Sequence, residues 1–221
     1  MRKYFFNRLL HVFFPSRCWH CTEELIAEEK FLCCYCDQEL ERVYYGPINV
    51  HLLEEIDCYG LYFYEEKSLV QKLIHGLKYG HIKQLGFELG FRLAATLPKS
   101  CLPQLILPVP ITPRKCLERG YNQSEWISKG FQACTGVRMN VKLLKRIKNT
   151  PSQTQLSKRE RQKNVDGAFK LAQPLPPGIN HVGIIDDVLT TGATLQQVVK
   201  VLNAAYPHLR ITIFVASIAR G

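Results

Sequence analysis

The sequence predicts an α/β protein with a mainly parallel sheet flanked by helices, preceded by a small metal-binding module. The apolar run 182–185 passes through a Thr- and Gly-rich turn into a helix-patterned segment, 195–206, which is the strand–loop–helix order of parallel sheets. Two further apolar runs, 104–108 and 210–218, are typical of buried strands. Two Cys-x-x-Cys pairs near the N-terminus supply the ligands that metal modules use.

The length of 221 residues allows one medium domain and a small satellite. With 46% hydrophobic and 22% charged residues, the chain has the composition of a folded globular protein, so disorder is not expected. The sequence has nine cysteines and lacks the features of a secretion signal, so we predict a protein of the reducing cytoplasm. We expect no transmembrane segment, because no apolar run approaches the ~20 residues that cross a bilayer.

The net charge of +10 is concentrated in one segment. Residues 142–163 contain eight Lys and Arg residues against one Glu, an excess of seven positive charges. Such a segment suits a polyanionic ligand, nucleic acid or both, and a solvated loop is the alternative. Because 145–163 has no apolar period, we predict a long loop that acts as a lid, with Gln155, Arg159 and Arg161 closing over a ligand.

The stretch 182–194 reads Val-Gly-Ile-Ile-Asp-Asp-Val-Leu-Thr-Thr-Gly-Ala-Thr. Asp186 and Asp187 follow the apolar run, at the edge where open α/β sheets bind ligands. The next loop offers backbone N–H groups, hydroxyls and a helix N-terminus to a phosphate, and Gly192 lets a ligand approach the backbone. Since carboxylates repel phosphate, the aspartates suit sugar hydroxyls or a divalent cation. A ribose 5-phosphate has this distribution of groups; ordinary turn and cap residues are the alternative.

A second loop follows the predicted strand 104–108. Three prolines fix this loop, which leaves the N–H groups of Ile111 and Thr112 to face an anion. Arg119 precedes a predicted helix, where it would neutralise a bound anion. The alternative is a surface cation, with Asn122 acting only as the helix cap.

Four cysteines define the N-terminal module. Cys18 and Cys21 are separated by eleven residues from the pair Cys33 and Cys36, and four thiolates are the ligand set of tetrahedral structural zinc. Such a site would hold together a region too small for its own core, and metal-free buried thiols are the alternative. Cys34 could replace Cys33, but its spacing is poorer for chelation.

Apolar spacing predicts an amphipathic helix at 5–13 and another at 65–78. The first packs on the cysteine module or lies on a membrane surface. In the helix that follows the second, Gly86 and Gly90 lie beside the apolar stripe, where a neighbouring helix could pack closely. The segment 139–146 alternates in the manner of a strand.

The stretch 182–194 resembles the PRPP-binding signature of type I phosphoribosyltransferases, and 107–113 resembles the Val-Pro loop of amidophosphoribosyltransferases. Together with the cysteine pairs and the blocks 77–80, 108–123 and 146–169, these motifs resemble in their order the ComF family. This family consists of phosphoribosyltransferase-like proteins associated with DNA uptake in naturally competent bacteria. The resemblance covers nearly the whole chain.

The resemblance implies a zinc-ribbon-like module over 1–57 and a type I phosphoribosyltransferase-like, PRPP-binding domain over 58–221. It implies PRPP with Mg2+ as ligand, and single-stranded DNA and proteins of the competence machinery as partners; any membrane association would be made through those partners. The site residues expected are Asp186, Asp187, Thr190, Thr191, Gly192, Ala193 and Thr194 for ribose 5-phosphate, Ile111, Thr112 and Arg119 for diphosphate, and Cys18, Cys21, Cys33 and Cys36 for structural zinc.

Two functions stay open at this point. One is a binding module that grips single strands, with aromatic platforms either near the cysteine pairs or at Tyr121 beside Arg119. The other is an active transferase that displaces diphosphate from PRPP with an unknown nitrogen acceptor, unrelated to DNA. That displacement needs charge neutralisation, orientation and exclusion of water more than a protein nucleophile, so no catalytic residue is assigned.

Overall fold

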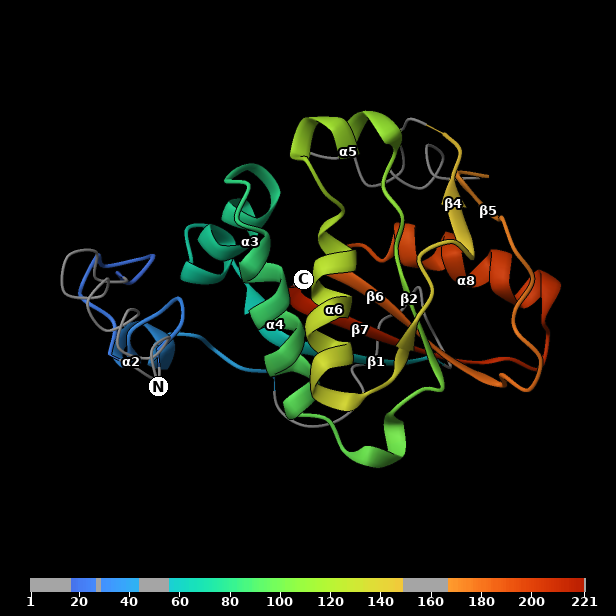
Figure 1. The fold of residues 1–221 in the computed structure, drawn as a ribbon, viewed down its shortest axis with the longest axis horizontal. Coiled ribbons are helices and arrows are strands. Elements are labelled where there is room, and N and C mark those ends of the chain that lie inside the picture. The colour runs from blue at the N-terminus through green and yellow to red at the C-terminus, as the bar shows by residue number, and fades with distance from the viewer. Residues whose placement is uncertain (1–16, 27–28, 44–55, 149–166, 221) are drawn as a thin grey trace, which may run out of the picture. The chain divides into compact units, whose positions relative to one another are not determined.

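The computed structural model describes residues 17–26, 29–43, 56–148 and 167–220 (Figure 1). The chain divides into two compact units, Met1–Glu41 and Arg42–Gly221, and each is described by itself. Several predicted features lie outside the described residues: the helix at 5–13 and the lid residues Gln155, Arg159 and Arg161. Every helix in the described ranges is too short or too polar to cross a bilayer.

The first unit is built around its cysteines. Its described part holds one short helix, α2 (Cys34–Gln38), and an antiparallel bridge between Arg17 and Glu24. The N–H of Trp19 donates to the carbonyl of Phe31 (2.8 Å), which joins the two cysteine-bearing segments. Among the described residues of this unit, the buried apolar side chains apart from cysteine are Leu25, Leu32 and Leu40. Within the described part, these three leucines alone are a small core.

The second unit contains a five-stranded sheet whose order is β1-β7-β6-β2-β3 and whose pairings are all parallel. Its strands are β1 (Asp57–Tyr64), β2 (Leu105–Pro108), β3 (Arg138–Met139), β6 (His181–Leu189) and β7 (Arg210–Ala219). The predicted strands at 104–108, 182–185 and 210–218 are confirmed. The predicted fold class, with its mainly parallel sheet, flanking helices and N-terminal cysteine cluster, is also confirmed.

The predicted strand at 139–146 is wrong, because the chain turns in its middle. The side-chain oxygen of Asn140 accepts hydrogen bonds from the N–H groups of Lys142 (2.8 Å) and Leu143 (3.1 Å), which closes a turn. The chain then leaves the main sheet and forms β4 (Leu144–Arg146), which pairs antiparallel with β5 (Phe169–Leu171) in a separate two-stranded sheet.

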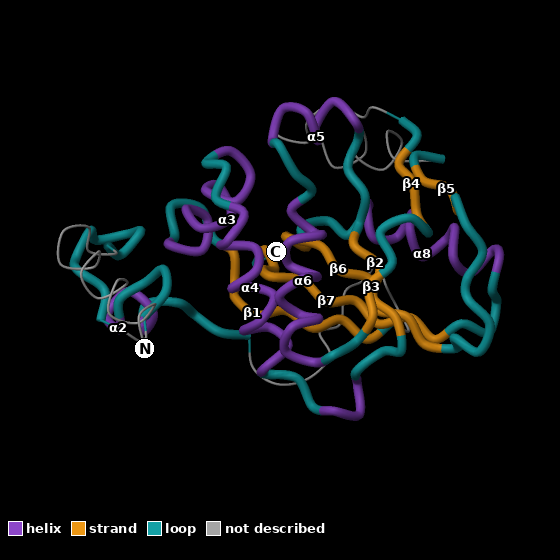
Figure 2. Tube along the Cα trace, viewed as in Figure 1, coloured by secondary structure: helices purple, strands orange, loops and turns teal. Residues whose placement is uncertain are grey.

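Helices cover both faces of the sheet (Figures 1 and 2). Helix α8 (Ala193–Ala205) buries Val198 and Leu202 in one core cluster with Ile184 of β6. On the other face, the ring of Phe131 lies 5.1 Å from the ring of Phe214. The helices besides α2 and α8 are α3 (Leu69–Tyr79), α4 (Lys83–Ala95), α5 (Pro113–Arg119), α6 (Gln123–Thr135) and the 3-10 turn η2 (Lys99–Cys101).

Helices α4 and α6 approach each other through glycines. A Cβ atom on Gly90 would lie 1.8 Å from the carbonyl oxygen of Ile127, and one on Gly130 would lie 1.8 Å from that of Phe87. A Cβ on Gly86 would lie 2.9 Å from the Cβ of Trp126. The predicted close neighbour beside Gly86 and Gly90 is therefore confirmed, and it is α6.

Candidate functional site

The two predicted ligand loops begin at the same edge of the sheet. Strands β2 and β6 are parallel neighbours, Pro108 is aligned with Ile185, and the N–H of Val109 donates to the carbonyl of Ile185 (2.9 Å). One expectation needs correction: β6 does not end before Asp186 but continues to Leu189, because its later residues still pair with β7. The aspartates therefore belong to the last part of the strand, which fixes their backbone.

Both aspartate side chains have defined partners from other elements. The hydroxyl of Ser124, in the first turn of α6, donates to Oδ1 of Asp186 (2.9 Å), which also accepts from the N–H of Asp187 (2.9 Å). The Nζ of Lys78, in the last turn of α3, lies 2.8 Å from Oδ2 of Asp187. Burial and then the charge of Asp187 raise the pKa of Asp186 to about 7, although Ser124 and Lys78 oppose the shift.

Four cations surround this aspartate pair. Burial would lower the pKa of Lys78, but the charge of Asp187 outweighs it and raises that pKa. The pKa of Lys115 is lowered by burial and then by the charges of Arg146 and Arg119. Burial also lowers the pKa of Arg146. Cations that repel one another at an incompletely neutralised site favour the binding of a multiply charged anion.

The loop after β2 is fixed to the start of α6. The amide Nδ2 of Asn122 donates to the carbonyl of Val109 (3.0 Å), and its Oδ1 accepts from the N–H of Ser124 (3.1 Å). Thr112 is buried and its hydroxyl caps α5. Within the described ranges, the N–H groups of Ile111 and Thr112 donate to no protein group. They are thus free to donate to a ligand.

Arg119 lies at the rim of this arrangement. Its Nη1 donates to Oε1 of Gln123 (2.9 Å), and its guanidinium lies 5.4 Å from the ring centre of Tyr79. Gln123 is 2% exposed, and no described group accepts from its Nε2. The Oε1 atom of this buried amide positions Arg119, and its Nε2 atom can donate to a ligand or water.

The loop of the central motif leads directly into α8. Gly192 has a φ of +76° and precedes the first helical residue, Ala193. The backbone at this position is therefore left-handed, which favours glycine. This is a second reason for glycine here, besides the close approach of a ligand to the backbone that the sequence suggested. Thr190 is exposed, and Thr191 and Thr194 are partly buried. The loop 190–194 follows the aspartate pair after two residues and lies at the N-terminus of a 13-residue helix. A helix N-terminus is a favourable place for a phosphate.

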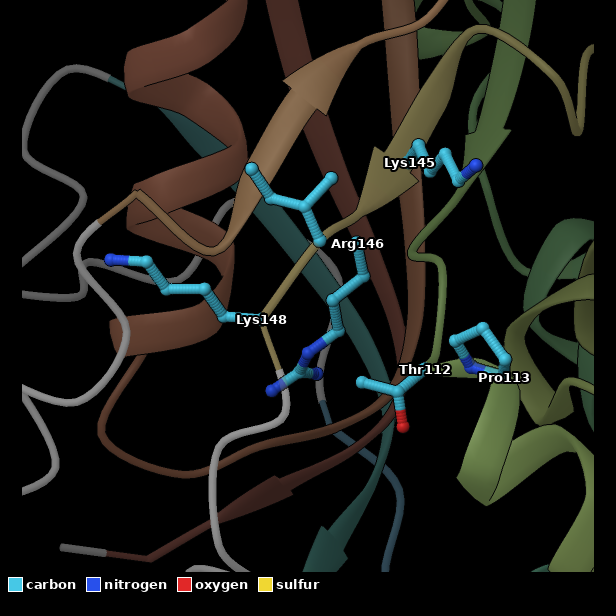
Figure 3. Close-up of a pocket in the computed structure, with 6 residues that line it drawn as sticks. Thr112, Pro113, Lys145, Arg146 and Lys148 are labelled. Atoms are coloured by element: carbon cyan, nitrogen blue, oxygen red, sulfur yellow. The ribbon is translucent and has the colours of Figure 1, made fainter.

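A cavity of about 320 Å³ lies between the start of α5 and strand β4 (Figure 3). Figure 3 shows the Arg146 side chain pointing toward Thr112, while the Lys148 side chain points away from Thr112. The guanidinium of Arg146 also lies 5.3 Å from the ring centre of Phe169. The residues that line the cavity are Thr112, Pro113, Lys145, Arg146, Ile147 and Lys148. Three cationic side chains make this a cavity for an anionic group.

Sequence reasoning missed the partners of the aspartates. Ser124 and Gln123 directly follow the predicted cap Asn122, and a helix start next to a ligand loop was a usable signal for them. Lys78 and Arg146 come from segments distant in sequence, and only the tertiary fold brings them near Asp186 and Asp187.

The four predicted cysteines come together in the first unit. The sulfur atoms of Cys18, Cys21, Cys33 and Cys36 all lie within 4.8 Å of one another, and a tetrahedral zinc with ~2.3 Å bonds needs about 3.8 Å between them. Burial would raise the pKa of Cys18, but backbone N–H donors, including those of Cys21 and Cys33, lower it to about 6, which favours the thiolate that binds metal. Cys34 is exposed and lies outside the cluster. The donor set fits a structural zinc ion.

Comparison with known proteins gives the following similarities. Competence protein F of Haemophilus influenzae is 28% identical over 220 residues, which cover 86% of this chain and 92% of that protein. DNA utilization protein YhgH of Salmonella typhi is 31% identical over 139 residues, and that of Escherichia coli K12 is 30% identical over 136 residues. These two matches cover 59% of this chain and 59% of each YhgH protein. No family model matches the chain.

Two solved structures are similar to 61% of this chain, each at 19% identity and a TM-score of 0.41. One is an allosteric regulatory enzyme of purine biosynthesis, of which 25% is covered. The other is glutamine PRPP amidotransferase from B. subtilis in complex with ADP and GMP, of which 26% is covered.

Proposed function

The chain belongs to the ComF family, and from this premise we propose that it binds PRPP and takes part in the handling or uptake of single-stranded DNA during natural transformation. The names of competence protein F and of the YhgH proteins support the DNA role. One observation carries the PRPP role: Asp186 and Asp187 lie directly before a helix-terminal phosphate loop and beside a second loop with free N–H groups.

The proposed pose follows from the chemistry of each group. The 5-phosphate binds the loop 190–194 at the N-terminus of α8, and the ribose hydroxyls donate to Asp186 and Asp187. The diphosphate binds the N–H groups of Ile111 and Thr112 and the guanidinium of Arg119. Mg2+, when bound, would neutralise the diphosphate.

Lys78 has a defined part in this pose. Its ammonium pairs with Asp187 at 2.8 Å, in a position that a ribose hydroxyl or a cation must share. Ligand binding therefore exchanges one partner of Asp187 for another, and the released ammonium adds positive charge near the diphosphate. We propose that the ion pair with Lys78 keeps Asp187 ordered before PRPP arrives.

For the first unit we propose a structural zinc ion held by Cys18, Cys21, Cys33 and Cys36. The cluster has four sulfur ligands, and a closed set of four thiolates leaves no position for substrate. The ion would hold together a segment whose described part has three buried leucines.

Calorimetric titration with PRPP and Mg2+ tests the main proposal. The wild-type chain should bind, and Asp187→Asn should lose most of the affinity because hydroxyl donors then face a neutral amide. Asp57→Asn is the matched control, since Asp57 begins β1 at the opposite edge of the sheet. If folded wild-type protein does not bind PRPP, or if Asp187→Asn binds as well as Asp57→Asn, the proposed PRPP site is wrong.

A second candidate function is transfer of ribose 5-phosphate from PRPP to a nitrogen acceptor, unrelated to DNA. The cavity of about 320 Å³ beside Thr112 and Arg146 favours it, because it offers an acceptor space beside the proposed diphosphate loop, and its cationic lining suits an acceptor that also carries an anionic group. Diphosphate release from PRPP in the presence of nucleobases, amines or ammonia measures this activity. Release by a protein that binds no single-stranded DNA would replace the DNA role with this one.

A further inference from the structure

Three contacts between cations and aromatic rings gather on the side of the second unit formed by α3, α4 and α6. The guanidinium of Arg119 lies 5.4 Å from the ring centre of Tyr79. The ring of Trp126 has Lys129 Nζ at 3.9 Å and Lys83 Nζ at 5.1 Å from its centre. We call these residues, with Tyr121 between them, the aromatic–cation surface: Tyr79, Lys83, Arg119, Tyr121, Trp126 and Lys129.

A ring contact and two hydrogen bonds hold the parts of this surface together. The rings of Tyr121 and Trp126 are 6.5 Å apart and meet edge to face. The Tyr121 hydroxyl donates to the carbonyl of Leu77 (2.6 Å), and a ring nitrogen of His81 donates to the carbonyl of Arg119 (3.1 Å). These bonds tie the segment between α5 and α6 to the end of α3, so the aromatic rings keep their spacing.

The surface also keeps its positive charge. Within the described part of the chain, neither Lys83 nor Lys129 forms an ion pair with a carboxylate. Ring faces hold these ammonium groups in place without cancelling their charge. Glu125 is the nearby acid in the first turn of α6, and its carboxylate accepts from the Asn122 amide (3.4 Å).

Exposed ring area is present beside these cations. Tyr79 is 55% exposed, and Trp126 is partly exposed. Proteins that bind single strands combine cations for the phosphates with aromatic rings on which unstacked bases lie. In a duplex the base faces are already stacked, so ring faces give no advantage there.

We propose that the aromatic–cation surface binds single-stranded nucleic acid, an inference that rests on the proposed DNA role and locates it. Phosphates draw Lys83, Lys129 and Arg119 away from the rings that they cover in the free protein. Bases then stack on the ring faces of Tyr79 and Trp126 that these cations leave. Because Arg119 also belongs to the proposed diphosphate site, the strand passes along the rim of the PRPP site.

Charge reversal on the full chain tests the location. The probe is a short fluorescein-labelled oligothymidylate, and the readout is fluorescence anisotropy over a range of salt concentrations. The double variant Lys83→Glu/Lys129→Glu is compared with Lys99→Glu/Lys200→Glu, which makes the same charge change at two exposed lysines on η2 and α8. Loss of two phosphate contacts should lower the slope of log affinity against log salt by about 1.4 and weaken binding at least about tenfold. The control should stay close to the wild type.

Two further measurements protect this test against a folding defect. Tyr79→Ala removes an exposed ring and should weaken binding on the order of tenfold, with urea unfolding followed by circular dichroism used as the check of folding. Trp19→Phe leaves Trp126 as the single tryptophan of the chain, and its fluorescence should be quenched as oligothymidylate is added.

Each outcome of these measurements either supports the proposed surface or overturns it. If the wild type binds the oligonucleotide but the two double variants bind alike with equal salt slopes, the surface is wrong and the DNA role stands. If the duplex of the same length binds as tightly as the single strand, the assignment to single strands is wrong. If the wild type binds no oligonucleotide at all, both the surface and the proposed DNA role are overturned, while PRPP binding is unaffected.

Discussion

The close approach of α4 and α6 can be tested by adding one methyl group to either glycine at the contact. A Cβ on Gly90 or Gly130 would lie 1.8 Å from a carbonyl oxygen of the opposite helix, whereas ordinary contact begins at 3.4 Å. The helix backbones must therefore separate by about 1.6 Å (3.4 − 1.8). Overpacking costs about 1–3 kcal/mol, and a clash with a backbone carbonyl, which cannot rotate away, belongs at the upper end, about 3 kcal/mol. The higher helix propensity of alanine returns about 1 kcal/mol. We expect Gly90→Ala and Gly130→Ala each to lose about 2 kcal/mol in the free energy of unfolding.

Urea unfolding followed by circular dichroism measures this loss. Ala133→Gly, at an exposed position of α6, is the control for helix propensity alone and should lose about 1 kcal/mol. Because α6 carries Ser124, which donates to Asp186, separation of the helices should also weaken PRPP binding. Gly90→Ala or Gly130→Ala protein as stable as the wild type would refute the reasoning.

Three other predictions concern the two sites. Burial and Asp187 raise the folded pKa of Asp186 to about 7 from an ordinary 3.8, so the folded state keeps a proton that the unfolded chain releases. The free energy of unfolding should therefore fall as pH rises between these values, by at most about 1.4 kcal/mol per pH unit, and Asp186→Asn should abolish this dependence in urea titrations. Lys78→Met leaves Asp187 without its ion-pair partner and should cost about 2 kcal/mol in urea unfolding; an unchanged value would contradict the pairing. Cys36→Ser, or chelation of zinc, should make the first unit sensitive to protease while the second unit stays resistant, and Cys34→Ser should have no effect.

The sequence predicted those parts of the structure that depend on local pattern. Three strands of the main sheet have apolar runs of the expected length, and the aspartate pair with its loop is a contiguous motif. Strand β1 was not predicted, because Asp57–Tyr64 mixes aromatic and small residues with a glycine and has no clear alternation. The predicted strand at 139–146 was wrong because the side chain of Asn140 closes a turn there. An alternation of polar and apolar residues does not reveal such a turn.

The candidate site was predicted only in part for a related reason. The sequence indicates which loops offer N–H groups and carboxylates, but not which distant side chains complete them. Lys78 reaches Asp187 from another helix, and Arg146 acts on Asp186 from the two-stranded sheet. Such partners depend on how helices and sheets pack against one another. Residue spacing along the chain does not predict that packing.

The side chain of Asn122 has a consequence for ligand choice. One amide joins the carbonyl of Val109 to the N–H of Ser124, and Ser124 in turn holds Asp186. The anion loop after β2 and the carboxylates of β6 thus form one rigid frame with a fixed separation. A frame of this kind selects ligands by the distance between their sugar and their far phosphate, so a ribose phosphate that lacks the second anionic group would fill only half of it.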